Sequence, residues 1–334
     1  MPPALLDRLH AAVSDAVRSF GPDDPRTLDA RLALGLGFRE RGRDDDAYAE
    51  LAAVARDRAR VLGPEHPDTF TARHEAALSR LHTHICAVEP GPEALPEAVR
   101  LLEDVAADRE RVLGPDHPDT LAVLLNLGYV YGTAGRFTES AATEARLLPG
   151  WQRAVAEAER TLGPDDPETQ FRRLRLAHEC DSRDRRDEAL ALREEVRAAW
   201  GRVAADRAAR LGEIHPGTLD ARQHHAWAHR WTGRPDDELR LDREIVADHE
   251  RILGPTGPRT LQAKAAFAWA HHDLPESVDL AAEIIDEVAA TLDEEHLRKV
   301  RTVLVLHLAR TDRSDEAQAL AARYPLPTDD EDDY

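Results

Sequence analysis

The sequence is poor in lysine, cysteine, methionine and aromatic residues, and it has no excess of positive charge. Its 334 residues include two cysteines, one methionine and 5% aromatic residues, and Lys264 and Lys299 are its only lysines. The formal net charge of −20 argues against nucleic acid or an anionic membrane as the main partner, because both repel an acidic surface. No apolar run is long enough to span a bilayer, and Asp7 and Arg8 interrupt the first apolar stretch. We therefore expect a cytoplasmic protein that binds neither nucleic acid nor membrane.

Motifs of common catalytic sites are also missing. There is no glycine-rich phosphate loop, no Gly-x-Ser-x-Gly, no His-Glu-x-x-His and no Cys-x-x-Cys. Cys86 and Cys180 lie far apart in the sequence, and free thiols are the expected state in the cytoplasm. The sequence therefore predicts no catalytic residues and no cofactor, and it favours a function other than catalysis.

A short phrase recurs six times along the chain. One copy reads Leu113-Gly-Pro-Asp-His-Pro-Asp-Thr120, and the phrase glycines are Gly21, Gly63, Gly114, Gly163, Gly212 and Gly254. These glycines are 42, 51, 49, 49 and 42 residues apart, and a period in that range is typical of a repeat solenoid. Glycine ends a helix in the left-handed conformation, and the second proline of the phrase suits the first position of the next helix. The phrase therefore predicts a helix, a tight turn and a second helix.

Each unit between two phrases contains two amphipathic helices. Counting from the residue after the phrase threonine, position eight is always small, and position twenty is small in four copies. The residues at position eight are Gly35, Ala77, Gly128, Ala177, Ala226 and Ala268, and those at position twenty are Ala47, Ala98, Ser140 and Ala189. Small residues at these positions allow two helices to approach closely.

These residues resemble the tetratricopeptide repeat, in the 42-residue variety seen in kinesin light chains and in many bacterial proteins. The third copy, from Thr120 to Gly135, is the most similar to that pattern. The resemblance implies an all-α fold, a right-handed superhelical solenoid of about fifteen helices without β-strands. We expect a capping helix over residues 1–20, a solenoid of six copies and a degenerate final pair over 21–326, and a disordered acidic tail over 327–334.

Three units are longer than 42 residues. The extra stretch of the second copy, Glu89 to Pro96, is predicted to be a loop, whereas the third and fourth copies are predicted to have a longer second helix. Both longer helices carry a tryptophan at matching positions, Trp151 and Trp200. These two side chains either pack on each other along a protruding ridge or form a second contact surface, such as a homodimer interface.

Histidines are numerous, 16 in all. His225 and His229 are four residues apart, a spacing that suits metal ligands, and His271 and His272 follow on the next equivalent helix. Because His229 and His271 occupy position eleven, which faces the seam between helices, we expect buried seam histidines and no metal site.

The resemblance also implies a concave groove lined by the first helix of each pair. The candidate ligand-binding residues are Leu36, His74, Asn126, Tyr129, His178, Gln223, Trp227, Arg230, Trp231 and Trp269. Large aromatic side chains on an exposed wall suit recognition. The charged residues at the groove positions have a net charge of −3. Five are acidic, Asp29, Glu40, Asp181, Asp220 and Asp273, and two are basic, Arg39 and Arg230.

We therefore predict a scaffold or adaptor that binds a protein or peptide segment with an apolar anchor and a net positive charge. Two alternatives remain open. One is a signalling regulator that responds to a peptide, and the other is an enzyme or small-molecule binder that uses the groove, with His178 and His225 as candidates.

Overall fold

The computed structural model describes residues 5–86, 93–213, 215–292, 294–311 and 313–324. Within these ranges the chain forms fifteen α-helices and no β-strand, as predicted. Contacts divide the chain into two units, with the boundary between Glu157 and Ala158 near the end of one long helix. The acidic tail and most of the predicted loop of the second copy lie outside the described residues.

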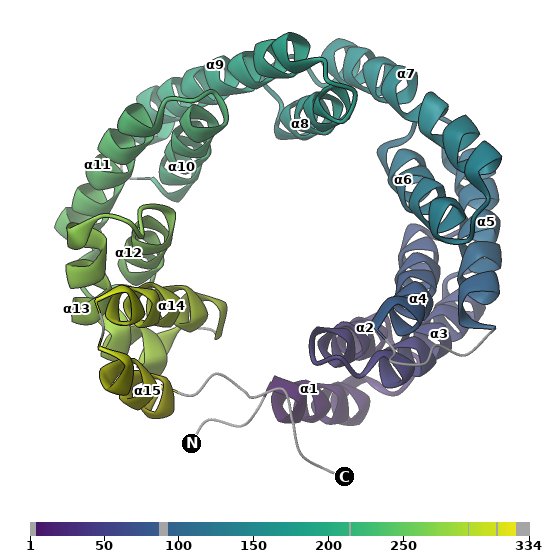
Figure 1. Cartoon of the computed structure of the whole chain (residues 1–334), viewed down its shortest axis with the longest axis horizontal. Coiled ribbons are helices and arrows are strands. Elements are labelled where there is room, and N and C mark those ends of the chain that lie inside the picture. Colours follow the sequence, from purple (N-terminus) through teal and green to yellow (C-terminus); the bar gives the residue numbers. More distant parts are fainter. Residues whose placement is uncertain (1–4, 87–92, 214, 293, 312, 325–334) are drawn as a thin grey trace. The chain divides into compact units, whose positions relative to one another are not determined.

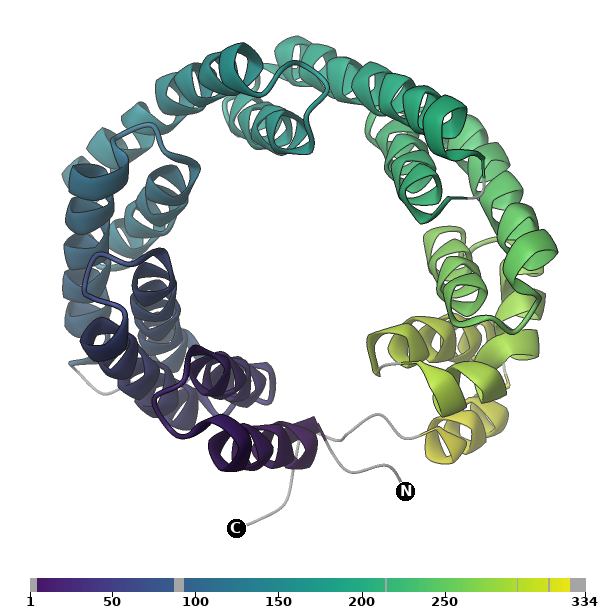
Figure 2. The same cartoon turned by 180° about the vertical axis from the view of Figure 1, so that it is seen from behind.

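In the first unit, helices alternate between two layers (Figures 1 and 2). One layer contains α2 (Pro25–Glu40), α4 (Pro67–Cys86) and α6 (Pro118–Thr133). The other contains α1 (Leu5–Phe20), α3 (Asp44–Val61), α5 (Ala94–Leu113) and α7 (Phe137–Thr161). Successive helices from α1 to α6 pack on one another, so each helix pair forms a repeat that contacts the next.

The second unit is built in the same way. Its inner layer, on the concave side in Figure 1, contains α8 (Pro167–Asp181), α10 (Pro216–Trp231), α12 (Pro258–Ala270) and α14 (Glu294–Arg310). Its outer layer contains α9 (Arg186–Leu211), α11 (Pro235–Leu253), α13 (Pro275–Thr291) and α15 (Ser314–Arg323). In the final pair, α14 packs on α12, α13 and α15.

The repeated phrase forms the turn between repeats. Each helix that follows a phrase begins at its second proline, as predicted. The six phrase glycines have φ between 81° and 103°, but ψ is 162° at Gly114 and 155° at Gly212. Gly114 and Gly212 therefore do not adopt the left-handed helical conformation that we expected. They adopt an extended conformation with positive φ, which is even more specific to glycine.

The phrase threonine has a role that the sequence reasoning missed. All six of these threonines are completely buried. In four copies the hydroxyl donates to the carbonyl of the phrase glycine at 2.8–2.9 Å, namely in Thr27, Thr69, Thr169 and Thr218. The hydroxyl thereby links the end of one helix to the start of the next across the turn.

Both aspartate and histidine act as helix N-caps in this turn. Asp24 and Asp166 accept the backbone N–H two residues ahead, and so do His117 and His215 through Nδ1, at 3.2 and 3.1 Å. A histidine can act in this way only if its Nδ1 carries no proton. The histidine caps therefore satisfy a backbone donor that would otherwise be unpaired.

The close approach of paired helices is confirmed. A Cβ added to Gly35 would lie 2.7 Å from Leu51 Cγ, and the alanines at position eight are 0% exposed, as Ala177 and Ala226 show. Helices α7 and α9, with 25 and 26 residues, are longer than α3 with 18, as predicted for the third and fourth copies.

Two expectations about the longer copies need correction. Helix α5 begins at Ala94, so the last three residues of the predicted loop, including Pro96, form its first turn, where proline removes no helical hydrogen bond. Trp151 and Trp200 are only 2% and 7% exposed, so neither forms an exposed ridge. Trp200 packs with Val196, Ala204 and Ala221 of its own unit.

Candidate functional site

Three of the candidate residues, His74, Asn126 and Tyr129, lie on the inner layer of the first unit. The side chain of Tyr129 is 59% exposed. His74 and Asn126, which come from neighbouring repeats, are joined by a hydrogen bond of 2.9 Å between Asn126 Nδ2 and His74 Nε2. Burial, together with the charges of Arg109 and Arg39, lowers the pKa of His74 to about 4. The imidazole is therefore neutral and accepts from Asn126, and that amide nitrogen is already used within the protein.

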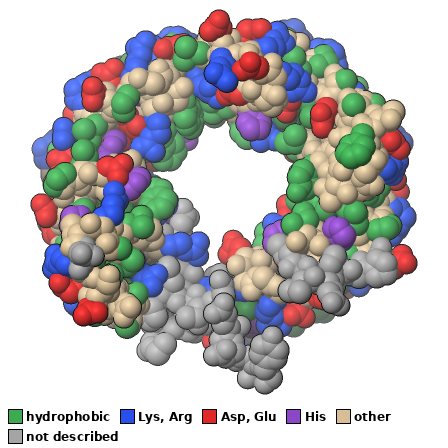
Figure 3. Space-filling view, viewed as in Figure 1, with side chains coloured by type: hydrophobic (Ala, Val, Ile, Leu, Met, Phe, Trp, Pro, Cys, Tyr) green, Lys and Arg blue, Asp and Glu red, His purple; other side chains and the backbone are tan. Residues whose placement is uncertain are grey.

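In the second unit, the inner layer presents three tryptophans to solvent. Trp227, Trp231 and Trp269 are 38%, 39% and 45% exposed, although tryptophan commonly packs inside proteins. Apolar and histidine side chains lie beside Lys or Arg along this inner edge (Figure 3). Helices α10 and α12 therefore expose three indole rings to solvent.

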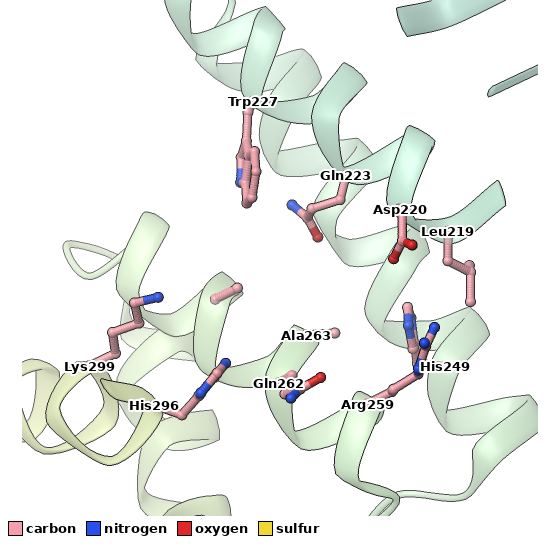
Figure 4. A pocket seen from close by; sticks show the side chains of 11 residues that line it. Leu219, Asp220, Gln223, Trp227, His249, Arg259, Gln262, Ala263, His296 and Lys299 are labelled. Carbon is pink, nitrogen blue, oxygen red and sulfur yellow. The ribbon is translucent and has the colours of Figure 1, made fainter. Parts of the chain in front are cut away.

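A pocket of about 310 Å³ lies beside Trp227, between α10, α12 and α14. Its lining from α10 includes Asp220, Gln223 and Trp227, whose side chains point toward the opening in Figure 4. His296 and Lys299 of α14 line the opposite side. The remaining lining residues are Leu219, His249, Arg259, Gln262, Ala263 and Ala266. Sequence reasoning identified Gln223 and Trp227 but missed His296 and Lys299, because α14 belongs to the irregular final pair and matches no repeat position. It also missed Arg259, because this residue lies in the repeated phrase and not at a groove position.

The ring of Trp227 is held by a stack of aromatic side chains. His224 stacks on buried Trp200 with ring centroids 4.3 Å apart, and its edge meets Trp227 at 5.2 Å. Trp200 is fixed in the core of its unit, so it orients His224, which in turn restricts Trp227. A restricted aromatic ring loses less conformational entropy when it binds a ligand.

The acidic rim expected from the sequence is largely neutralised inside the protein. Asp29 pairs with Arg58, Asp181 pairs with Arg193, and Asp273 pairs with Arg310. At the pocket itself the balance of charges is different. Arg259 and Lys299 outnumber the single carboxylate of Asp220, so the lining has a formal charge of +1 with neutral histidines.

Behind the pocket, a buried polar network connects α10, α11 and the end of α12. Gln223 donates to Asp242 at 2.9 Å, and Arg230 donates to Glu238 at 2.9 Å and to the carbonyl of Ala270 at 2.7 Å. His271 Nε2 lies 2.9 Å from the other oxygen of Asp242. Arg230, predicted to contact a ligand, is therefore tied to the protein by two hydrogen bonds.

The remaining candidate histidines do not form a catalytic group among the described residues. His178 is exposed. His225 lies against His229, with ring centroids 4.8 Å apart, and burial lowers its pKa to about 4. His229 is 6% exposed, which confirms its place in the helix seam. Leu36, at the same position as Trp227 but in the first unit, is partly buried.

Comparisons with known proteins agree with this architecture. One sequence model of the tetratricopeptide repeat matches residues 93–151, and another matches residues 27–68 and 218–259. No curated protein matches the chain significantly. Similar solved structures include a putative kinesin light chain of Podosopora anserina with nearly identical TPR-like repeats, at 24% identity and a TM-score of 0.36, covering 67% of this chain and 95% of that one.

Two other solved structures are also similar. BtubC (BKLC) from P. vanneervenii has 13% identity and a TM-score of 0.42, with 75% of this chain and 94% of that one covered. A circular tandem repeat protein with a novel repeat topology has 15% identity and a TM-score of 0.30, with 95% and 80% covered.

Stacked helix pairs with small residues at their seams define an α-helical repeat scaffold. This chain contains tetratricopeptide repeats, which two sequence models of that family match over residues 27–68, 93–151 and 218–259. Scaffolds of this family generally mediate protein–protein interaction. Among the described helices, none combines the length and apolarity that crossing a membrane requires.

Proposed function

We propose that the chain is an adaptor that binds an extended protein segment on the inner layer of its second unit. The pocket beside Trp227 carries this proposal, because it places an exposed, oriented indole next to a cavity of about 310 Å³. Rigid aromatic side chains at the edge of a pocket are frequent hot spots of protein interfaces. Trp231 and Trp269, on the same layer, extend the apolar surface beyond the pocket.

The charges of the pocket indicate the charge of the bound segment. Arg259 is exposed and has no ion pair among the described residues, and it shares the pocket with Lys299. We propose a segment with one large apolar anchor and an aspartate or glutamate nearby, in place of the basic segment expected from the sequence. A carboxylate between a guanidinium and an ammonium forms charge-assisted hydrogen bonds, which are stronger than neutral ones.

A peptide library displayed on phage tests this proposal directly. Selection on the full-length protein should enrich peptides that combine an aromatic or large aliphatic residue with an acidic residue. Trp227→Ala should weaken the binding of the selected peptides by about tenfold or more, as expected for a hot-spot residue. Arg259→Ala should weaken the binding of acidic peptides. It should hardly affect the binding of the same peptides with aspartate or glutamate replaced by asparagine or glutamine.

A matched control is available on another surface of the same unit. Phe171, on α8, is 50% exposed but lies outside the pocket lining. Phe171→Ala should leave the affinity of the selected peptides unchanged. If enriched peptides bind Trp227→Ala and Arg259→Ala as tightly as the unaltered protein, the pocket is not the binding site and the proposal is wrong.

A further inference from the structure

The buried network behind the pocket contains an arrangement of ligand atoms that has no role in the proposed peptide binding. One carboxylate oxygen each from Glu238 and Asp242 and one ring nitrogen of His271 lie within 4.8 Å of one another. The two carboxylates are four residues apart on α11 and therefore lie on one face of the helix. His271 directly follows α12, so the fold of the second unit brings these three side chains together.

These groups are strongly buried. Glu238 is 1% exposed and Asp242 is 3% exposed, and the side chain of His271 is 9% exposed. Among the described residues, Arg230 is the one guanidinium that hydrogen-bonds to the cluster, and it donates to Oε2 of Glu238. With His271 neutral, the two carboxylates and the guanidinium of Arg230 have a net charge of −1. A buried net charge is unfavourable unless a cation compensates it.

A second observation is that the cluster contains a buried oxygen atom without a hydrogen-bond partner. Oε1 of Glu238 is buried and has no hydrogen-bond partner, although Oε2 of the same carboxylate is paired with Arg230. A buried carboxylate oxygen without a donor costs free energy. Asp242, by contrast, is oriented by Gln223 through its Oδ1, which leaves Oδ2 next to His271.

We propose that Glu238, Asp242 and His271 bind a divalent transition-metal ion of the zinc class. One imidazole nitrogen and two carboxylate oxygens suit zinc, manganese or cobalt, whereas magnesium and calcium prefer oxygen ligands alone. Ligands bound at about 2.0–2.2 Å are roughly 3.3–3.6 Å apart around a tetrahedral ion, so small side-chain rotations would close the site. The sequence reasoning expected no metal because it grouped His271 with His225 and His229, not with the carboxylates of α11.

The ion would connect α11 with the end of α12, and α10 reaches the same cluster through Gln223 and Arg230. Gln223 both lines the pocket and donates to Asp242, and an oriented second-shell partner of this kind commonly holds a metal ligand in place. The metal proposal does not rest on the proposed peptide binding, and its test does not require a peptide.

The test uses the full-length chain without an affinity tag, stripped of metal by a chelator and then dialysed. Zinc is titrated by calorimetry, and cobalt is added to observe the visible absorption bands that report its ligands. We expect one equivalent of metal per chain and a higher melting temperature with metal. Glu238→Gln, Asp242→Asn and His271→Gln should each weaken binding by about tenfold or more.

Glu244→Gln provides the matched control, because Glu244 also lies on α11 but pairs with Arg240 outside the cluster. This variant should bind zinc with unchanged affinity. Glu238→Gln retains an oxygen that can accept from Arg230, so circular dichroism without metal should show unaltered helicity. The proposal is overturned if the unaltered protein binds less than one equivalent, or if the three cluster variants bind zinc and alter the cobalt spectrum no differently from Glu244→Gln.

Discussion

Replacement of Gly114 by alanine tests the conformation of the turn between repeats. Gly114 has φ 97° and ψ 162°, a region that residues with a Cβ avoid. A Cβ at this position would have no atom within 4 Å, so the substitution neither removes nor adds packing. The expected loss of stability is therefore that of backbone strain alone, about 2 kcal/mol within a usual range of roughly 1–3 kcal/mol.

The effect should be visible in thermal and urea unfolding followed by circular dichroism. For a unit of this size, about 2 kcal/mol corresponds to a decrease in melting temperature of roughly 4–8 °C. Because repeats contact mainly their neighbours, hydrogen exchange should increase first in α5 and α6, which flank the turn.

Gly132→Ala is the control for Gly114→Ala. Gly132 lies inside α6, and its nearest atom for an added Cβ is Ser140 Oγ at 3.7 Å, an ordinary contact. Alanine should therefore stabilise this helix by about 0.5–1 kcal/mol. If Gly114→Ala unfolds at the same urea concentration as the unaltered protein, while Gly132→Ala behaves as expected, then the positive φ of the phrase glycine is not what the turn requires.

Two further predictions follow from burial. Trp151→Ala should lower the free energy of unfolding by about 3–5 kcal/mol, because this side chain is 2% exposed. Trp227→Ala should lower it far less and should weaken peptide binding instead. Equal decreases for the two variants in urea unfolding would contradict this prediction. Because the pKa of His74 is about 4 in the folded state and about 6.5 in the unfolded chain, its contribution to stability is complete above pH 6.5 and is lost as the pH falls toward 4. That loss reaches about 3 kcal/mol. His74→Gln should therefore make stability less dependent on pH between 6.5 and 4, and identical pH profiles for the two proteins would show that His74 is not held neutral.

The sequence alone determined the helical architecture because its signals are local. Proline at a helix start and glycine at a helix end act through the backbone of one or two residues, so the start of α6 at Pro118 could be predicted without knowledge of the fold. The small residues at the seams recur at fixed spacing, which predicted the close packing at Gly35. The exposure of Trp227 and Trp269 was expected from the resemblance to tetratricopeptide repeats, which places both on the inner wall.

Tertiary structure decided which side chains meet. His271 was predicted to lie in a helix seam, but its pairing with Asp242 depends on how α12 packs against α11, and no spacing along the chain encodes this contact. The pocket includes Lys299 only because the irregular α14 turns toward α12. Likewise, Trp200 stacks on His224 of the next helix. Helix ends depend on neighbouring residues in the chain, whereas pockets, ion pairs and ring stacks depend on residues that become neighbours only when the helices pack.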